Sequence, residues 1–433
     1  MKNIRTVFLL ASITMLILTV LSSSSLAADI NSVGDLGANA LSSPKIPGDT
    51  IIQFPDPNFE AAVRELIGKP TGNILAGDVA EISSMSLYEC GITDLSGIEY
   101  FTALESLACG KNDLTTLNMS KNLILKSLFC ESNRLETLDV SQNDMLEILD
   151  CTENGLRTLD VSQNPALKEL SCGENRLVVL DVSRNPMLEG LSCAMNGLTI
   201  LDVSHNTALK YLSCESNRLE TLRVSQIPAL KQLHCSDNQL TSLDVTCNVA
   251  LTELSCYKNQ LTILDVSLNP VLEYLICDGN YLITLDVSHN PALLVLCCSS
   301  NQLVTLDVSR NTVLTSLSCL GNQLTALDIT RNSALTTIYC SSNQLTTLDV
   351  SHNTILKNLY CGRNQLTALD VDQNTTLEGL YCSDNQLTKL DVSHNATLRR
   401  LECHGNLFPD KFAITGLNEE KLYHFIFDPQ NSL

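Results

Sequence analysis

Leucine, cysteine and asparagine recur along most of the chain with a period of 21 residues. The unit has the form L-x-x-L-x-C-x-x-N-x-L-T-x-L-D-V-S-x-N-x-x and is clearest in residues 356–376 and 377–397. Fourteen full copies run from Leu104 to Thr397, and a fifteenth breaks off near Phe408. The cysteines of these copies are Cys109, Cys130, Cys151, Cys172, Cys193, Cys214, Cys235, Cys256, Cys277, Cys298, Cys319, Cys340, Cys361, Cys382 and Cys403. Self-similarity at such a period predicts a solenoid of stacked coils.

Each coil is predicted to contribute one short strand to a parallel sheet. In the copy that starts at Leu356, Leu359 and Cys361 lie two residues apart, so they share one face of a strand. The ninth position of the unit is Asn in every copy, from Asn112 to Asn406. An amide at this bend can satisfy backbone groups of adjacent coils that no strand ladder reaches. Stacked coils would therefore bury one continuous core.

The second half of the unit follows the same logic as the first. The pattern L-T-x-L-D-V-S-x-N, as in residues 345–353, adds a second asparagine ladder in which Ile227 is the one exception. We therefore expect strand-like backbone on both sides of each coil. If both sides stack at a similar spacing, the solenoid curves only weakly.

At these positions the unit resembles the bacterial 21-residue leucine-rich repeats with nested periodicity, the IRREKO class. Residues 54–70 are similar to the helical caps of internalin-like surface proteins, and residues 82–103 resemble one 22-residue internalin-type repeat. Cys90 departs from that repeat, because it stands where the ladder Asn would be. The resemblance implies an α/β repeat protein that is mostly β: a single, right-handed leucine-rich repeat solenoid with a parallel sheet and a short helical N-terminal cap.

The segments outside the 21-residue copies predict an exported protein with capped ends. Residues 1–27 have a basic start, an apolar stretch and a small-x-small ending, which is typical of a cleaved signal peptide; an uncleaved anchor is the alternative. Residues 28–49 are expected to be a flexible leader, 50–81 the N-terminal cap, 82–408 the solenoid and 409–433 the C-terminal cap. We expect a secreted, periplasmic or cell-surface protein with no membrane insertion after cleavage.

Composition and charge narrow the kinds of partner. The formal net charge is −21, aromatic residues make up 4% of the chain, and tryptophan is absent. Few aromatics beside many leucines fit one small packing unit used many times. The negative charge repels nucleic acid and anionic membrane surfaces. It is compatible with a cationic partner or with bound metal ions.

The sequence predicts no catalysis and no cofactor. It contains no G-x-S-x-G, H-E-x-x-H or phosphate-loop motif, and four of its seven histidines occupy the same variable turn position. The ladder cysteines should point inward as small hydrophobic groups, with disulfides between coils or metal ligation as alternatives. Among the remaining cysteines, Cys247 and Cys297 are expected to be the most reactive thiols, and chance replacement is the other interpretation.

Aspartate forms a third ladder at position 15 of the unit. It occurs in twelve of fourteen copies: Asp139, Asp160, Asp181, Asp202, Asp244, Asp265, Asp286, Asp307, Asp328, Asp349, Asp370 and Asp391. Carboxylates stacked at about 4.8 Å repel one another by roughly 0.9 kcal/mol even in water. The expected compensation is hydrogen bonding to the turn backbone and the nearby Ser; binding of Ca²⁺ or a basic partner is the alternative.

Positions 3, 5 and 7 of the unit should line the exposed face of the sheet. The early coils are acidic there, with Glu131, Asp150, Glu169 and Glu215. Six of the ten tyrosines also fall on these positions: Tyr211, Tyr257, Tyr274, Tyr339, Tyr360 and Tyr381. The last three occupy position 5 of consecutive coils, so we expect them to stack.

We predict that this tyrosine stack is the contact patch for a partner, with His234 and Ile276 as weaker neighbours, because exposed tyrosines are favoured at binding hot spots. The alternative is that Tyr simply suits strands. The resemblance implies an adaptor-like scaffold that binds a protein or a glycan, but it does not identify this partner. Two further functions stay open: a structural or self-associating surface protein, and a cation-dependent binder that uses the stacked aspartates.

Overall fold

The structure of the chain is a computed structural model, which describes residues 46–431. From Pro47 onward these residues belong to one compact unit. The predicted signal peptide, residues 1–27, and most of the predicted leader, residues 28–49, lie outside the described residues. Among the described residues, no helix is both long enough and apolar enough to cross a membrane.

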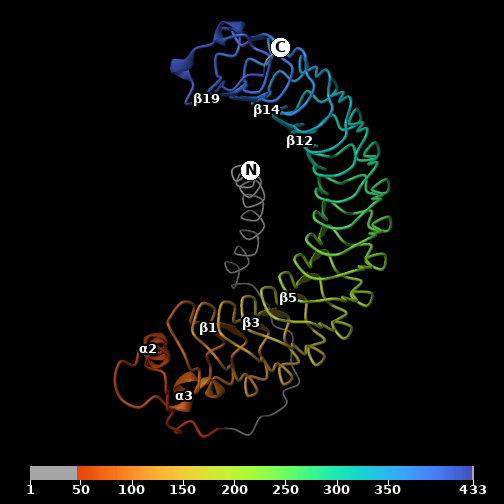
Figure 1. Cartoon of the computed structure of the whole chain (residues 1–433). Helices are drawn as coiled ribbons and strands as arrows, with labels where there is room; N and C mark the ends of the chain where they lie inside the picture. The colour runs from red at the N-terminus through yellow and green to blue at the C-terminus, as the bar shows by residue number, and fades with distance from the viewer. Residues whose placement is uncertain (1–45, 432–433) are drawn as a thin grey trace. The chain divides into compact units, whose positions relative to one another are not determined.

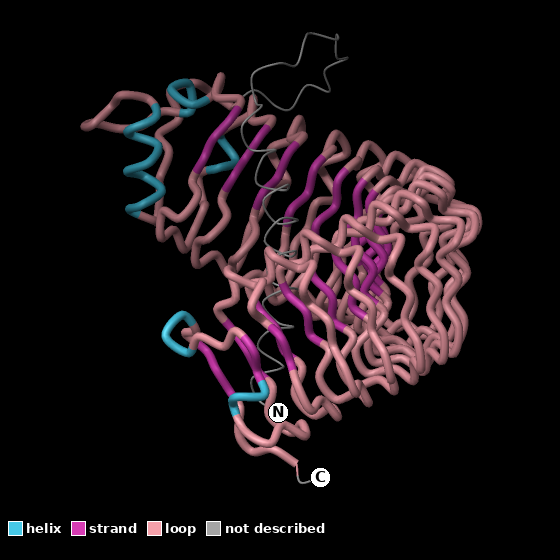
Figure 2. The backbone as a smooth tube through the Cα atoms, turned by 90° about the horizontal axis from the view of Figure 1, so that it is seen from above, coloured by secondary structure: helices cyan, strands magenta, loops and turns pink. Residues whose placement is uncertain are grey.

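Seventeen three-residue strands form one parallel sheet, and each coil contributes one of them (Figure 2). Every strand between the end strands β1 and β19 pairs in register with the strands of the preceding and following coils. The strands are β1 (Ser84–Ser86), β2 (Ser106–Ala108), β3 (Ser127–Phe129), β4 (Ile148–Asp150), β5 (Glu169–Ser171), β6 (Gly190–Ser192), β7 (Tyr211–Ser213), β8 (Gln232–His234), β9 (Glu253–Ser255), β10 (Tyr274–Ile276), β11 (Val295–Cys297), β12 (Ser316–Ser318), β13 (Thr337–Tyr339), β14 (Asn358–Tyr360), β15 (Gly379–Tyr381), β17 (Arg400–Glu402) and β19 (His424–Ile426). The predicted mostly β repeat solenoid is confirmed.

The repeat puts the same residue types on the buried side of every strand. In β14, Leu359 is fully buried, whereas its neighbours Asn358 and Tyr360 are partly exposed. Leu359 pairs in register with Leu380 of β15, and Cys361 just beyond β14 is also fully buried. Because side chains alternate along a strand, the L-x-C pattern forms inward rows that merge into one core.

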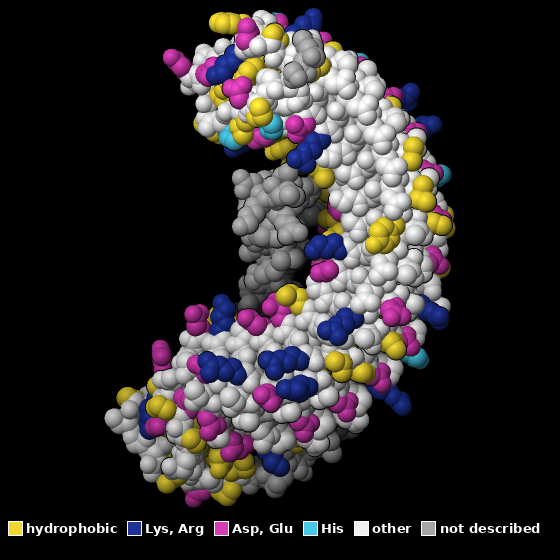
Figure 3. All heavy atoms as spheres, viewed as in Figure 1, with side chains coloured by type: hydrophobic (Ala, Val, Ile, Leu, Met, Phe, Trp, Pro, Cys, Tyr) yellow, Lys and Arg dark blue, Asp and Glu magenta, His cyan; other side chains and the backbone are white. Residues whose placement is uncertain are grey.

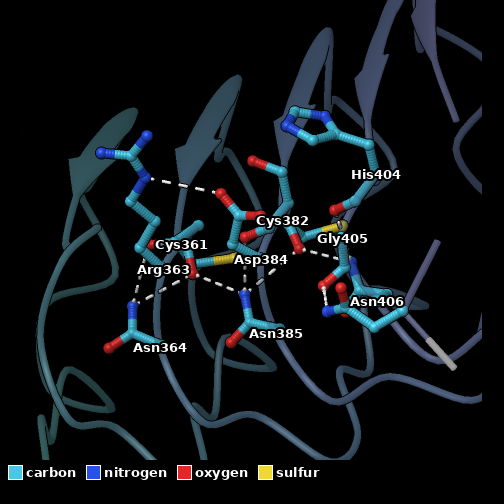
Figure 4. A network of polar contacts seen from close by, with 12 residues as sticks. Cys361, Arg363, Asn364, Cys382, Asp384, Asn385, His404, Gly405 and Asn406 are labelled. Atoms are coloured by element: carbon cyan, nitrogen blue, oxygen red, sulfur yellow. Dashed lines mark hydrogen bonds and ion pairs between the residues drawn. The ribbon is translucent and has the colours of Figure 1, made fainter. Parts of the chain in front are cut away.

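The first asparagine ladder joins neighbouring coils where the strands end (Figure 4). The Nδ2 of Asn385 donates to the carbonyl oxygen of Cys382 in its own coil at 3.1 Å and to that of Cys361 in the preceding coil at 3.0 Å. Its Oδ1 accepts a hydrogen bond from the backbone N–H of Leu366 at 3.0 Å. One amide thus satisfies buried backbone groups of two coils, as the sequence predicts.

The second half of each coil does not form a continuous sheet. Apart from β16 (Leu390–Asp391) with β18 (Ile414–Thr415), the pairing found there among the described residues is a single bridge between Asn118 and Asp139. The prediction of strand-like backbone on both sides of the coil is therefore wrong for most coils.

Local turns use the backbone groups that a second sheet would need. The N–H of Ser288 donates to Asp286 Oδ1 at 2.9 Å, and the N–H of Asn290 donates to the carbonyl oxygen of Val287 at 3.1 Å. The second asparagine ladder still links the coils, because Asn290 Nδ2 donates to the carbonyl oxygen of Val266 at 2.8 Å. The expectation of weak curvature required a second sheet on the other side of the coils. Without such a sheet the coils follow an arc, and the strands lie along its inner side (Figure 1).

A short helix covers the N-terminal end of the solenoid. Helix α2 (Pro57–Leu66) begins after Asp56, whose Oδ1 accepts from the N–H groups of Asn58 and Phe59 at 2.9 and 3.0 Å. The Oδ2 of Asp56 accepts from the N–H and the hydroxyl of Thr93 at 2.7 and 2.8 Å, so the carboxylate bonds the helix to the first coil. The other described helices are α3 (Ala76–Val79), η2 (Ile98–Tyr100), η3 (Lys411–Ala413) and η4 (Glu419–Lys421).

The chain beyond the last copy of the repeat adds one more strand. β19 pairs with β17, which places Phe425 beside Leu401. Phe427 is buried and packs on Phe408 with ring centroids 6.0 Å apart. These residues cover the last coil, in the segment where the sequence predicts the C-terminal cap.

Candidate functional site

Three tyrosines form a stack on the exposed face of the sheet. Tyr339, Tyr360 and Tyr381 end β13, β14 and β15 and are paired in register. The ring centroids of Tyr339 and Tyr360 lie 4.4 Å apart with planes inclined by 17°, and those of Tyr360 and Tyr381 lie 4.2 Å apart with planes inclined by 7°. The predicted stacking is present, because parallel in-register strands bring the same repeat position of neighbouring coils within one strand spacing.

The tyrosine stack offers phenol edges more than ring faces. Both faces of the Tyr360 ring are covered by its neighbours, so its hydroxyl edge is what a partner can reach. Burial raises the pKa of all three phenols, which keeps them protonated and able to donate hydrogen bonds. Gly379 makes room for the last ring, since a Cβ there would lie 3.0 Å from Cε2 of Tyr381.

A second polar cluster surrounds His234 on β8. Its Nδ1 lies 3.7 Å from Oε1 of Glu215, and its Nε2 lies 3.2 Å from Oε2 of Glu253. The ring of Tyr211 meets the imidazole edge-on, with centroids 5.7 Å apart, and burial raises the pKa of Tyr211 to about 12. Two predicted site residues thus lie together, beside carboxylates that the sequence had not paired with them.

The other predicted site residues lie apart from the tyrosine stack. Tyr274 and Ile276 belong to β10, and β11 and β12 separate them from β13. Tyr257 follows β9, and the ammonium group of Lys258 lies 5.6 Å from the centre of its ring. The predicted residues therefore form separate groups along the sheet.

Three carboxylates cross the sheet face near its N-terminal end. Glu131, Asp150 and Glu169 stand in consecutive coils at positions 7, 5 and 3 of the repeat, and all three are partly buried. Burial raises the pKa of each carboxyl group. The ion pairs formed among the described residues include none of the three. We call Glu131, Asp150 and Glu169 the carboxylate diagonal.

Two glycines let the ends of the carboxylate diagonal lie against the sheet. A Cβ at Gly110 would collide with the carboxylate of Glu131, and a Cβ at Gly190 would collide with that of Glu169. Each glycine occupies the same repeat position as that carboxylate, one coil away. The Oε2 atom of Glu131 is buried and has no hydrogen-bond partner among the described residues.

The aspartate ladder at position 15 has a different environment. Oδ1 of Asp139 accepts from the N–H of Ser141 at 2.9 Å, and Asp160 and Ser162 repeat this bond in the next coil. These aspartates are exposed, and hydrogen bonds from the following serine hold their pKa below the ordinary value. The bonds support turn capping as the role of the ladder. Within residues 46–431, no group of three or more His, Cys, Asp or Glu side chains is arranged to hold a metal ion.

The cysteines divide into buried and exposed groups. The fifteen ladder cysteines are buried and free, and burial raises their pKa, for Cys256 and Cys340 to about 12. Cys247 is exposed, as expected of a reactive thiol. Cys297 is only partly exposed and its pKa is raised by burial, which argues against the reactivity expected for it; Cys90 is exposed instead.

A further charge pattern in the sequence lies at position 2 of the repeat. Position 2 of the early coils alternates between Glu and Lys, and adjacent coils form ion pairs there: Lys126 with Glu105 at 2.8 Å and Lys168 with Glu147 at 2.6 Å. On the viewed face, charged side chains of both signs gather over the coils of β1 to β5, whereas the coils around β12 are mostly uncharged (Figure 3).

Comparison with known proteins relates the fold to bacterial leucine-rich repeat proteins. No protein-family model matches the chain. Over 70 residues it is 38% identical to internalin J of Listeria monocytogenes serotype 4b, a match that covers 16% of this chain and only 8% of that protein. The solved functional domain of internalin J from L. monocytogenes, which includes a cysteine ladder, is 37% identical; the match covers 83% of this chain and 78% of that domain, with a TM-score of 0.72.

Two further solved structures share the fold. A leucine-rich repeat protein of Leptospira interrogans is 26% identical over 81% of this chain and 97% of its own, with a TM-score of 0.72. An internalin, InlF, from L. monocytogenes is 21% identical over 75% of this chain and 94% of its own, with a TM-score of 0.63. The last likeness concerns the fold alone.

Proposed function

Because this chain belongs to the internalin-type leucine-rich repeat proteins of bacteria, we propose that it is an exported, non-catalytic scaffold that binds a protein partner through its sheet face. Its exposed face is a row of short strands whose outward positions vary while the inward ones do not. Such a surface can change its contacts without disturbing the core, which suits recognition. A glycan is the alternative ligand. We assign the repeat unit to the nested 21-residue class and residues 1–27 to a signal peptide.

The tyrosine stack is the observation that carries this proposal. Tyr339, Tyr360 and Tyr381 expose phenol edges from a rigid sheet, so a partner can gain contact area and hydrogen bonds without ordering mobile side chains. Tyrosine contributes strongly to interfaces because it combines a large apolar body with a polar end.

The test is capture of a partner by the immobilised protein. The partner is taken from a native envelope extract or a host extract. A variant with Tyr339→Ser, Tyr360→Ser and Tyr381→Ser should fold normally and should capture about tenfold less of this partner than the wild type does. Tyr281→Ser is the matched control, because Tyr281 is exposed at position 10 of the repeat, away from the strands. Equal capture by the wild type and the triple variant would place the contact elsewhere.

A further inference from the structure

We propose that Arg400, together with the hydroxyl groups of Tyr360 and Tyr381, binds a carboxylate on an acidic segment of the protein partner. The inference rests on the proposed function, because it names the chemistry that the partner presents to the tyrosine stack. It also adds to that stack a residue of the next strand, β17. We call Tyr360, Tyr381 and Arg400 the arginine–tyrosine site.

The register of the sheet brings Arg400 beside the last ring of the tyrosine stack. Arg400 on β17 is paired with Gly379 on β15. The ring of Tyr381 lies over Gly379, since a Cβ on that glycine would stand 3.0 Å from Cε2 and 3.6 Å from Cζ of the ring. Cζ carries the hydroxyl group, so this group lies about one strand spacing, roughly 4.8 Å, from the row of Arg400. Burial raises the pKa of Tyr360 and Tyr381, and the nearby positive charge of Arg400 opposes that rise.

The guanidinium group of Arg400 is held in place but donates to no acceptor of the protein. Its central carbon lies 4.9 Å from the centre of the Tyr423 ring. This cation–π contact positions the group and leaves its N–H donors free. Within residues 46–431, the guanidinium forms no ion pair and no hydrogen bond. Because Arg400 is only partly exposed, a carboxylate that reaches it gains charge-assisted hydrogen bonds at a group already shielded from part of the solvent.

The nearest carboxylates on the sheet face have other partners. Glu402, two residues after Arg400 on the same strand, lies 2.6 Å from Nε2 of His424. Glu378 in the preceding coil lies 3.9 Å from Nζ of Lys357. These carboxylates therefore leave the charge of Arg400 available to a partner. The net charge of the whole chain, −21, does not prevent this, because charges more than about 8 Å away are largely screened at physiological ionic strength.

A carboxylate from a protein segment matches this set of donors. A guanidinium group presents two parallel N–H groups, which fit the two oxygens of one carboxylate. The phenols add further donors, because they are protonated. The uncharged part of the segment can lie on the neighbouring coils around β12, where the viewed face is mostly uncharged (Figure 3). The partner is therefore an extended segment in which an Asp or Glu accompanies uncharged residues.

Direct binding of defined peptides tests the inference without knowledge of the natural partner. The probe is a fluorescent nine-residue peptide with three central glutamates between serines and with both termini blocked. Matched peptides carry three glutamines, or one central phosphoserine, in place of the glutamates. Binding to the full chain is followed by fluorescence anisotropy at physiological ionic strength.

Two neighbouring arginines provide the test variant and its control. Arg400→Gln removes the guanidinium of the arginine–tyrosine site. Arg399→Gln removes the same charge one residue away, where Nη1 already donates to the carbonyl oxygens of Ala396 and Leu398 at 3.1 and 2.9 Å. A third variant, Tyr360→Phe with Tyr381→Phe, keeps the stacked rings and removes their hydroxyl groups.

We expect the glutamate peptide to bind the wild type and Arg399→Gln alike, and to bind Arg400→Gln at least about tenfold more weakly. Arg400→Lys should recover part of this binding, because it keeps the charge, and such recovery excludes a loss of fold as the cause. The phenylalanine variant should bind about threefold more weakly than the wild type. The glutamine peptide should not bind.

Several results would overturn the inference. These are no binding of the glutamate peptide to the wild type, an equal loss in Arg400→Gln and Arg399→Gln, and full binding by the phenylalanine variant. Tighter binding of the phosphoserine peptide would identify a phosphate site instead. Displacement of the glutamate peptide by sialyllactose at equal ionic strength would identify an acidic glycan as the ligand.

The inference and the proposed function can fail separately. If the variant with Tyr339, Tyr360 and Tyr381 replaced by Ser loses the natural partner while the wild type ignores the glutamate peptide, this inference fails and the proposed function stands. If that variant still captures the natural partner while peptide binding depends on Arg400, the tyrosine stack fails as the contact patch and the carboxylate site stands.

Discussion

At the scale of single residues, the two asparagine ladders use the same side chain differently. In the amides at position 9, such as that of Asn385, Nδ2 donates hydrogen bonds and Oδ1 accepts one. Position-19 amides, such as that of Asn290, donate through Nδ2 while their Oδ1 is buried without a partner among the described residues. Since a buried acceptor without a donor is unfavourable, an asparagine at position 19 contributes less to the stability of the fold than one at position 9. This explains why Ile227, fully buried, can replace the asparagine there.

The half-buried carboxylate of Asp278, just beyond β10, should lower the stability of the folded chain, and an amide in its place should restore that stability. Burial raises the pKa of Asp278 to about 6 from an ordinary value of 3.8, although hydrogen bonds from Ser299 oppose the shift. The unfolded chain therefore loses this proton at lower pH than the folded chain. As pH rises from about 4 to 6, the folded state loses stability through this group.

Asp278→Asn keeps an acceptor for Ser299 and cannot ionise. We expect its free energy of unfolding at pH 8 to exceed that of the wild type by up to about 3 kcal/mol, and the difference to vanish below pH 4. Urea unfolding at several pH values measures this. The control, Asp286→Asn in the same coil, should change stability in the opposite direction, because hydrogen bonds from Ser288 lower the pKa of Asp286. A pH-independent difference for Asp278→Asn would contradict the argument.

The spacing of the repeat predicts which way each side chain faces, and the stacking of Tyr339 on Tyr360 follows from that alone. The burial of Asp278 and of the carboxylate diagonal does not follow. The burial of an acidic side chain depends on how large the neighbouring residues in adjacent coils are, and glycines such as Gly110 and Gly190 leave room for it. The sequence therefore predicts where the acidic residues lie on the sheet, but it does not predict how far each one is buried.

At the scale of elements, each strand owes its existence to its neighbours. Three residues are too few for an independent strand, so the sheet forms only when coils stack. The second half of the repeat has the same leucine spacing but remains a series of turns. Its aspartate and serine form local hydrogen bonds that compete with a sheet for the backbone groups, and for this reason the prediction of two sheets is wrong.

Helix α2 depends on one carboxylate for its connection to the first coil. Asp56→Ala removes the hydrogen bonds to Asn58, Phe59 and Thr93, so we expect a loss of about 2–3 kcal/mol in the free energy of unfolding of the N-terminal end. Hydrogen exchange of residues 57–66 and 84–108 measures where the loss falls. Asp94→Ala is the control, since among the described residues the carboxylate of Asp94 accepts hydrogen bonds from nearby Ser96 alone, and the backbone N–H that Asp94 donates to Asp56 is kept in the variant. Equal protection in both variants would mean that the cap holds without Asp56.

At the scale of the whole molecule, the described coils form a linear array in which each coil contacts its two neighbours. One core runs from the N-terminal cap to Phe427, and within residues 46–431 the strands in the middle of the array pair with the strands of adjacent coils alone. Opening can therefore begin at the ends, where a coil has only one stacked neighbour, and proceed inward. The cysteine ladder provides one reporter in nearly every coil of this array.

Thiol labelling should follow that order. In the native protein, Cys90 and Cys247 should react first, because both are exposed, and Cys297 should follow slowly. The ladder thiols should stay unlabelled, because they are buried and because their raised pKa keeps them protonated, whereas the thiolate is the reactive form. In mild denaturant, Cys403 near the end of the array should be modified before Cys256 near its middle, as mass spectrometry of pulse-labelled protein would show. The variant Cys90→Ser with Cys247→Ser should lose the fast phase and keep this order. Simultaneous modification of Cys403 and Cys256 would mean that the array opens as a single cooperative unit.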